Sequence, residues 1–145
     1  MSWWFAGEDN SLPISSGDLM ALAERLEQGL AGADEASERA SISRAYYSAV
    51  IHLRDKLSNT PGATSAPTKG LHGYLRQALR GSGRTHLKKM AQRLATLHAL
   101  RESADYETAG PRPTPHDISD AIKRAKDLIA DFDGLGVPDI LRIRP

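Results

Sequence analysis

Apolar residues recur along the chain at spacings of three and four, the pattern of helices with one buried face. No segment keeps the two-residue alternation that would indicate a strand. The spacing predicts five helices, at about residues 16–32, 34–58, 69–80, 85–104 and 115–133. Residues that commonly cap helix starts precede the first and the last of them, namely Ser15 or Ser16 and Thr114. The chain is therefore predicted to be all-α.

The connections between these helices are mostly short and rich in glycine and proline. Short connections place successive amphipathic helices side by side in opposite directions, so the sequence predicts an up-and-down bundle of four to five helices. The bundle is assigned to residues 15–134, after an N-terminal extension (residues 1–14) that carries Trp3, Trp4 and Phe5. These aromatic side chains either fold back onto the bundle or anchor a partner. Residues 135–145 form a C-terminal tail whose alternating pattern is too short to make a sheet by itself.

The composition fits one globular domain. A chain of 145 residues can bury a sizeable core, and 40% of its residues are hydrophobic. It contains no cysteine, which excludes disulfides and thiolate metal sites. No apolar run approaches the roughly 20 residues of a membrane-spanning helix, and the N-terminus lacks the pattern of a signal peptide. We therefore expect a cytoplasmic protein that does not contact a membrane.

The net charge of +1 conceals a separation of charge along the chain. Residues 1–40 hold eight acidic side chains against two basic ones, whereas residues 69–101 hold eight basic side chains and no acidic one. A stretch of one sign can bind the phosphates of a nucleic acid, and the candidates here are Arg84, Lys88, Lys89 and Arg93. The alternative is that this basic stretch faces the acidic half of the chain, within the fold or across a dimer.

The familiar motifs of nucleotide binding and covalent catalysis are missing. The chain holds no phosphate-binding loop, dinucleotide fingerprint or nucleophile elbow. No two of its five histidines stand at the spacing of a helical metal site. The sequence therefore predicts neither a metal nor another cofactor.

Two polar segments interrupt the apolar pattern, residues 43–52 on the second predicted helix and residues 100–106 at the end of the fourth. Arg44 lies among small and aromatic residues on the helix expected to be most buried, and a buried guanidinium needs a partner. We expect Asp105 to reach it, directly or through a water molecule. Arg101 and Asp105 are four apart and can also pair on their own helix. The predicted polar cluster contains Arg44 together with Tyr47, Arg101, Asp105 and Tyr106.

The order of these motifs resembles the HEPN superfamily, in particular a prokaryotic branch with Arg-Ala-Tyr-Tyr and Ala-Asp-Tyr signatures. The resemblance covers about residues 15–133 and rests on residues 43–47, 69–72 and 100–106. It implies a helical bundle that forms a homodimer. Many HEPN proteins are metal-independent ribonucleases of toxin–antitoxin or anti-phage systems, in which an arginine and a histidine act in the dimer cleft. Related members pair with a nucleotidyltransferase that can silence them.

Arg44 and His52 are the candidates for such a catalytic pair in this chain. Seven residues separate them, one more than the usual range, which turns the two side chains about 80° apart on a helix. Arg93 and His98 have the usual spacing, but Arg93 is predicted to point outward and His98 to adjoin the apolar stripe.

Three functions stay open at this point. The first is a homodimeric HEPN domain that binds and cleaves RNA without a metal. The second is a non-catalytic HEPN domain that binds a nucleotide, an RNA or a partner protein as a subunit of a defence complex. The third is a purely structural role in oligomerisation.

Overall fold

The computed structural model describes residues 14–29, 34–67 and 69–145, and these residues form an all-helical fold. The helices are α1 (Ser16–Glu27), α2 (Glu35–Ser58), α3 (Leu71–Arg80), α4 (Thr85–Tyr106), α5 (Pro115–Asp133) and α6 (Val137–Ile140). No strand occurs in this part of the chain. The predicted all-α class is confirmed, and the five predicted helices correspond to α1–α5.

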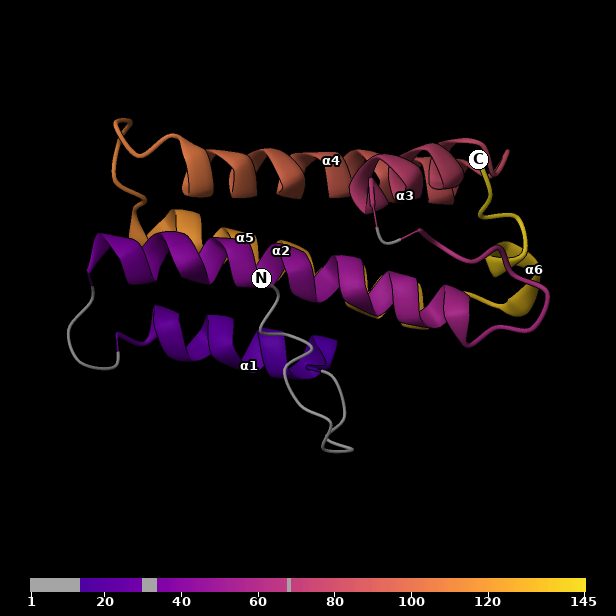
Figure 1. The fold of residues 1–145 in the computed structure, drawn as a ribbon, viewed down its shortest axis with the longest axis horizontal. Helices are drawn as coiled ribbons and strands as arrows, with labels where there is room; N and C mark the ends of the chain where they lie inside the picture. The colour runs from indigo at the N-terminus through magenta and orange to yellow at the C-terminus, as the bar shows by residue number, and fades with distance from the viewer. Residues whose placement is uncertain (1–13, 30–33, 68) are drawn as a thin grey trace.

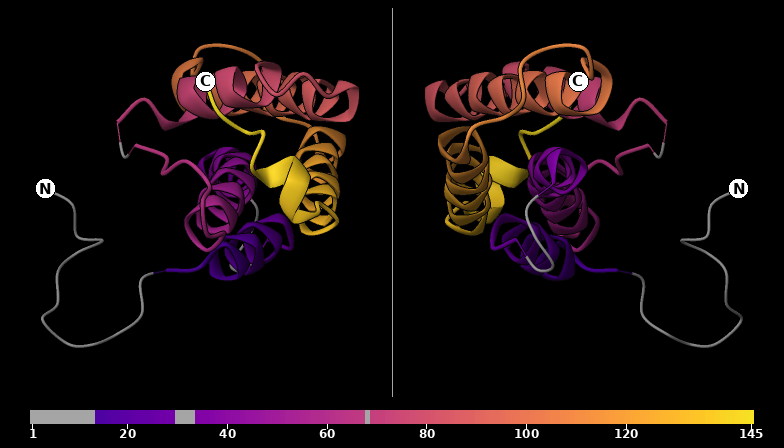
Figure 2. Two further views of the ribbon diagram at one scale, coloured as in Figure 1. Left: turned by 90° about the vertical axis from the view of Figure 1, so that its right-hand side faces the viewer. Right: turned by 90° about the vertical axis from the view of Figure 1, so that its left-hand side faces the viewer.

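The long helices run alternately in opposite directions and pack into a bundle around α2 (Figure 1). α2 contacts α1, α4 and α5, while the short α3 packs on α4. Viewed end on, α3 and α4 form one layer, α2 and α5 the next, and α1 lies beneath them (Figure 2). Because α2 is covered on several sides, its polar residues face other helices as well as solvent.

Two helix starts are closed by capping boxes. At α1 the Ser15 Oγ accepts a hydrogen bond from the Asp18 N–H (3.1 Å), and the Asp18 carboxylate accepts one from the Ser15 N–H (3.0 Å). Thr114 and Asp117 make the same exchange at α5, where Pro115 is the first helical residue. These side chains satisfy backbone N–H groups that have no partner inside the helix. The predicted starts of both helices are confirmed.

Three helix boundaries differ from the predictions. α1 ends at Glu27, ahead of the predicted stop, and residues 30–33 around that stop lie outside the described residues. α3 begins at Leu71 after Gly70, whose φ of 69° is the left-handed conformation that favours glycine. α4 continues to Tyr106, beyond the predicted end at residue 104. Its last turn therefore carries Asp105 and Tyr106 on the same helix as Arg101.

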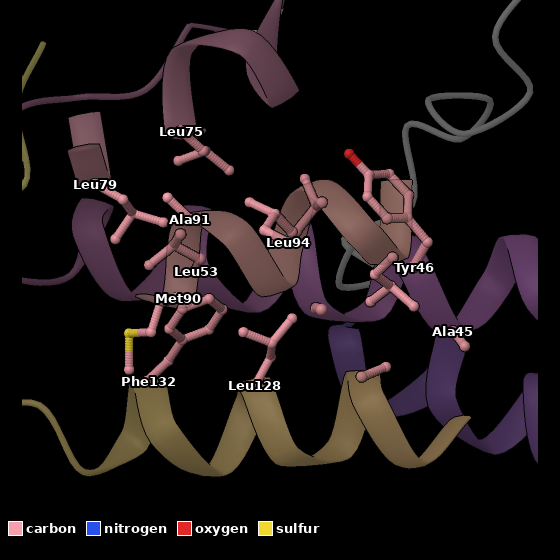
Figure 3. Packing of buried hydrophobic residues seen from close by; sticks show 14 of the residues in the cluster. Ala45, Tyr46, Leu53, Leu75, Leu79, Met90, Ala91, Leu94, Leu128 and Phe132 are labelled. Atoms are coloured by element: carbon pink, nitrogen blue, oxygen red, sulfur yellow. The ribbon is translucent and has the colours of Figure 1, made fainter. Parts of the chain in front are cut away.

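The core is formed by apolar side chains from every helix. Tyr46, Phe132 and several leucines are almost completely buried. Figure 3 shows the ring of Tyr46 among these side chains, with its hydroxyl turned away from α5. Burying a large apolar side chain is worth roughly 1.5–3 kcal/mol, but a buried tyrosine hydroxyl needs a hydrogen-bond partner. That partner comes from α3.

The C-terminal residues also contribute to this core. Ile140 in α6 and Ile143 after it are members of the buried cluster, and Ile143 keeps only 1% of its surface exposed. The sequence had set residues 135–145 apart as a tail beyond the bundle. α6 lies at one end of the bundle (Figure 1), and the buried side chains of Ile140 and Ile143 extend the packed body to Ile143.

The aromatic residues of the predicted N-terminal extension, Trp3, Trp4 and Phe5, lie outside the described residues. Among the helices that the structure describes, none is both long enough and apolar enough to cross a membrane.

Candidate functional site

Polar and aromatic side chains from α2, α3 and α4 meet where these three helices pack together. We call this group the Arg101 cluster, and its members are Ser43, Tyr46, Tyr47, His72, His98, Arg101, Asp105 and Tyr106. Four of them, Tyr47, Arg101, Asp105 and Tyr106, were predicted from the sequence to form a polar cluster. The structure brings these four together.

Arg101 lies at the centre of the cluster, with only 8% of its surface exposed. Its Nη2 donates a hydrogen bond to the Tyr47 hydroxyl (2.5 Å). Its Nε lies 3.0 Å from Oδ2 of Asp105, so the two side chains form an ion pair, although the angle does not suit a hydrogen bond. The guanidinium carbon is 5.1 Å from the ring centroid of Tyr47 and 5.5 Å from that of Tyr106, both within cation–π range. Burial lowers the pKa of Arg101, but the neighbouring Tyr47 and Asp105 outweigh it and hold that pKa above its ordinary value. Arg101 is therefore a fixed positive charge.

Asp105 pairs with Arg101 and makes no direct contact with Arg44 in the described residues, while the predicted alternative, a contact through a water molecule, stays a prediction. Its Oδ2 also accepts a hydrogen bond from the Ser43 hydroxyl (3.2 Å). Within the described residues, the half-buried Arg44 has neither an ion pair nor a side-chain hydrogen bond. Ser43 and Tyr47 are four apart and face α4, whereas Arg44 is about 100° further round α2. The predicted pair of Arg101 with Asp105 is confirmed.

Two histidines adjoin the buried Tyr46. The Tyr46 hydroxyl and Nδ1 of His72 share a hydrogen bond of 2.7 Å. The His98 ring lies edge-on to Tyr46, with 5.4 Å between the ring centroids, and its centroid is 5.1 Å from that of His72. Nε2 of His98 is 3.4 Å from the Glu102 carboxylate. The two imidazoles therefore form a pair beside the tyrosine.

Burial sets the charge of these groups. Desolvation lowers the pKa of His72, and His98 in its protonated form and the Arg101 cation lower it further. Desolvation also lowers the pKa of His98, against the opposing effect of Glu102. Burial raises the pKa of Tyr46 above its ordinary value. Both histidines therefore lose a proton more readily than a free histidine, and they do so beside a permanent cation, while the Tyr46 hydroxyl keeps its proton at neutral pH.

The described residues contain no group of three or more histidine, aspartate or glutamate side chains placed to hold a metal ion. The Arg101 cluster offers a different kind of chemistry. An uncharged imidazole can accept a proton, its protonated form can donate one, and a guanidinium attracts the charge of a phosphate. The cluster reaches the surface at the C-terminal end of α4, where Tyr106 keeps 72% of its surface exposed. It can therefore combine acid–base chemistry with the binding of an anion.

The predicted catalytic pair, Arg44 and His52, is held apart along α2. The two residues are about 12 Å apart along the helix axis, because each of eight residues rises by roughly 1.5 Å. Nδ1 of His52 is 3.1 Å from the Ser16 hydroxyl, and its Nε2 is 2.6 Å from Oδ1 of Asp133. His52 thus faces α1 and α5, on the side of α2 away from the Arg101 cluster.

The four basic residues predicted to bind nucleic acid do not share one environment. Arg93 forms an ion pair with Asp131 of α5, and Arg84 lies 3.9 Å from Asp139 of α6. Lys88 and Lys89 are exposed. Within the described part of the chain, the acids that pair with Arg84 and Arg93 come from the C-terminal helices and not from residues 1–40. The alternative that the basic stretch faces the acidic half across a dimer stays a prediction.

Three members of the cluster, Ser43, Tyr46 and His72, were not predicted as site residues. The sequence does place them in two of the motifs singled out, residues 43–47 and 69–72. Tyr46 and His72 are 26 residues apart, so their contact depends on how α3 folds back onto the bundle. No local pattern encodes that arrangement. His98 was predicted to adjoin the apolar stripe, and it lies against the buried ring of Tyr46.

Comparisons with known proteins give no match: no family model, no curated protein and no solved structure matches this chain. Its function is therefore inferred from the Arg101 cluster and from the motifs that form it.

Proposed function

We propose that this chain is a HEPN-type domain and a metal-independent endoribonuclease whose site is the Arg101 cluster. The observation that carries the proposal is one fixed cation, Arg101, in one cluster with two histidines, His72 and His98, whose ring centroids are 5.1 Å apart. RNA cleavage without a metal needs a base, an acid and positive charge for the phosphate. The same residues lie in or between the motifs by which the sequence resembles HEPN proteins.

In this proposal His72 acts as the base and His98 as the acid. His72 takes the proton of a ribose 2′-hydroxyl while the 2′-oxygen forms a bond to the neighbouring phosphorus. The bond from phosphorus to the 5′-oxygen breaks, and His98 gives its proton to that leaving oxygen. The products are a 2′,3′-cyclic phosphate and a 5′-hydroxyl end. Glu102, 3.4 Å from His98, favours the protonated form of this histidine, as does the charge of a bound phosphate.

Basic side chains of α2 and α4 supply the contacts to the RNA backbone. Arg101 stabilises the charge that develops on the phosphate oxygens of the reacting group. Arg44 lies one helical turn before Tyr47, and it has no ion pair within the described residues. Lys88 and Lys89 extend positive charge along the exposed side of α4. Arg44 thus keeps a role in the proposal, as a phosphate-binding residue and not as half of a pair with His52.

The wider context belongs to the same proposal. The protein acts in the cytoplasm as a homodimer of a toxin–antitoxin or anti-phage system, and a nucleotidyltransferase or another defence-complex subunit is its partner. The exposed ring of Tyr106 at the edge of the cluster supports a protein-covered face, because aromatic side chains are enriched in interfaces.

A second candidate function is a non-catalytic HEPN domain that binds a nucleotide, an RNA or a partner protein. The observation that favours it is that Arg101 is satisfied inside the protein. Its charge is matched by Asp105, its Nη2 is bonded to Tyr47, and little of its surface is exposed. A guanidinium held in this way stabilises the bundle even where it touches no substrate.

Cleavage of a labelled RNA in EDTA separates the two functions. The wild-type protein is expected to cleave the RNA and to leave 2′,3′-cyclic phosphate ends. His72→Gln and His98→Gln should each lower the rate roughly 100-fold or more, since each removes a proton-transfer group. The matched control is His86→Gln, which removes an exposed histidine paired with Asp139 outside the cluster and should leave the rate unchanged.

An RNA with a 2′-deoxyribose at the cleavage site tests the mechanism, because it lacks the attacking hydroxyl. Cleavage of that substrate, or equal rates in the cluster variants and the control, would contradict the proposed ribonuclease. A wild-type protein that binds RNA or a co-purifying subunit without cleaving RNA would establish the non-catalytic domain.

A further inference from the structure

A second group of reactive side chains lies on the other side of α2. Ser16 begins α1, His52 lies in α2 and Asp133 ends α5. The Ser16 Oγ is 3.1 Å from Nδ1 of His52, and Nε2 of His52 is 2.6 Å from Oδ1 of Asp133. All three residues line one cavity of about 350 Å³. A hydroxyl, an imidazole and a carboxylate therefore form a hydrogen-bonded chain beside a space that can hold a small molecule.

The partners of His52 define where its proton lies. The carboxylate of Asp133 can only accept a hydrogen bond, so Nε2 of His52 donates to it. Nδ1 then carries the lone pair, and it accepts the hydrogen bond of the Ser16 hydroxyl. In this arrangement a histidine can take a proton from a serine while a carboxylate holds the ring and stabilises the imidazolium. In serine proteases Nε2 of the histidine faces the serine and Nδ1 faces the aspartate, whereas here Nδ1 faces Ser16 and Nε2 faces Asp133. The histidine can still take a proton from the serine, because either ring nitrogen can accept one.

Ser16 lies at a helix start, where negative charge is stabilised. The Ser48 hydroxyl donates a hydrogen bond to the Ser16 carbonyl oxygen (2.7 Å) and so holds this turn against α2. The N–H groups of Ser16 and Gly17 belong to the first turn of α1, and within the described residues neither has an acceptor. Gly17 lines the same cavity. The N–H of the residue after a nucleophile is a common donor to the oxyanion of acyl transfer.

We propose that Ser16, His52 and Asp133 form an acyl-transfer site that hydrolyses small carboxylic esters. Ser16 is the nucleophile, His52 is the general base and acid, and Asp133 orients His52. This activity goes beyond the proposed ribonuclease, because it uses no residue of the Arg101 cluster.

Each turnover has two balanced steps. The Ser16 Oγ forms a bond to the carbonyl carbon of the ester while its proton moves to Nδ1 of His52. The bond from that carbon to the alcohol oxygen breaks, and the alcohol leaves with the proton from His52. A water molecule then attacks the acyl-serine and gives a proton to His52, which returns it to the serine oxygen as the carboxylic acid is released. The Gly17 N–H stabilises the oxyanion in both steps.

The lining of the cavity indicates the kind of ester. Met20, Ile129 and Ala130 supply apolar surface. Nζ of Lys126, which also lines the cavity, is 2.9 Å from the Glu24 carboxylate. Lys56, on the same helix as His52, lies 3.9 Å from Asp133, so both nearby lysines are matched by acids. The substrate class that fits is a short, uncharged acyl ester.

Hydrolysis of p-nitrophenyl butyrate tests the proposal. The wild-type protein is expected to release p-nitrophenol and, after a rapid quench, to carry a butyryl group on Ser16 in peptide mass spectra. Ser16→Ala should remove this modification, and His52→Gln should lower the rate roughly 100-fold. Two controls should match the wild type: Ser58→Ala removes an exposed serine at the end of α2, and His86→Gln removes another histidine paired with an aspartate.

A second measurement does not depend on the choice of ester. The chain has no cysteine, so Ser16→Cys introduces its only thiol. Because His52 accepts the proton, this thiol should react with iodoacetamide at pH 6 roughly tenfold faster than the thiol of Ser58→Cys. Adding His52→Gln should remove the difference. A butyryl label spread over exposed serines and lysines, or equal alkylation rates in the two cysteine variants, would overturn the proposal.

Discussion

The two sides of α2 both carry polar residues, but they use them differently. Toward α4, Ser43 and Tyr47 contact Asp105 and the fixed charge of Arg101. Toward α1, buried serines bond to the backbone instead: the Ser41 hydroxyl donates to the carbonyl oxygen of Ala23 (2.8 Å), and the Ser48 hydroxyl donates to that of Ser16 (2.7 Å). One side is organised around a charge, and the other around neutral hydrogen bonds to a neighbouring helix.

This difference separates two uses of polar groups inside a bundle. A serine that bonds a backbone carbonyl contributes about 1 kcal/mol and lets two helices approach closely, because its side chain is small. A buried arginine stabilises only while all its partners are present, since losing one member leaves the others desolvated and unpaired. The charged side of α2 should therefore be far more sensitive to substitution than the serine side.

Removing the charge should have the largest effect on stability. Arg101→Ala leaves the Asp105 carboxylate without its cation and the Tyr47 hydroxyl without its donor, so we expect the free energy of unfolding in urea to fall by about 3 kcal/mol. The matched control is Arg44→Ala, which removes an arginine without an ion pair in the described residues and should cost less than about 1 kcal/mol. If both variants lose the same free energy of unfolding, the partners of Arg101 do not make it more important for stability than Arg44.

Removing a serine hydroxyl from the other side should cost less. Ser41→Ala and Ser48→Ala each delete one hydrogen bond to a carbonyl of α1, and urea unfolding should show a loss of about 1 kcal/mol for each. Ser58→Ala, at an exposed position of the same helix, should change the free energy of unfolding by less than about 0.5 kcal/mol. A loss in either buried variant as large as that of Arg101→Ala would show that the two sides do not differ in the way inferred here.

The smallest expected effect is the dependence of stability on pH. His72 and His98 have lowered pKa values in the folded protein, so below the unfolded histidine pKa of 6.5 the unfolded chain binds more protons. The free energy of unfolding should therefore fall as the pH drops from about 7 toward 5, a span chosen to bracket the unfolded pKa. The double variant His72→Gln, His98→Gln should flatten this slope in urea titrations at several pH values. If the double variant keeps a slope as steep as that of the wild type, groups other than His72 and His98 cause the pH dependence of stability.

Interactions between residues three or four apart in the sequence determined the helix starts and one pair of site residues. Ser15 with Asp18, and Thr114 with Asp117, close helix starts across three residues, and both starts were predicted correctly. Arg101 and Asp105 are four apart on one helix, and their ion pair was predicted as well. Interactions of this range depend on the geometry of a single helix, which the sequence pattern already specifies.

Contacts between helices were decided only by the tertiary structure. Tyr47 and Arg101 are 54 residues apart, and Ser16 and His52 are 36 apart. The cluster of tyrosines with Arg101 was expected, but Asp105 meets Ser43 and not Arg44, and His72 joins from α3. The triad-like chain of Ser16, His52 and Asp133 had no local signal at all, because its members come from three helices.

These contacts could not be predicted because they depend on how α2 is rotated about its own axis. This helix is covered by α1, α4 and α5, so it carries no single apolar stripe from which its buried side could be read. Its sequence determined that Ser43, Tyr47 and His52 would lie on one long helix. The packing of three neighbouring helices decided that Tyr47 would meet Arg101 while His52 would turn toward α1 and α5.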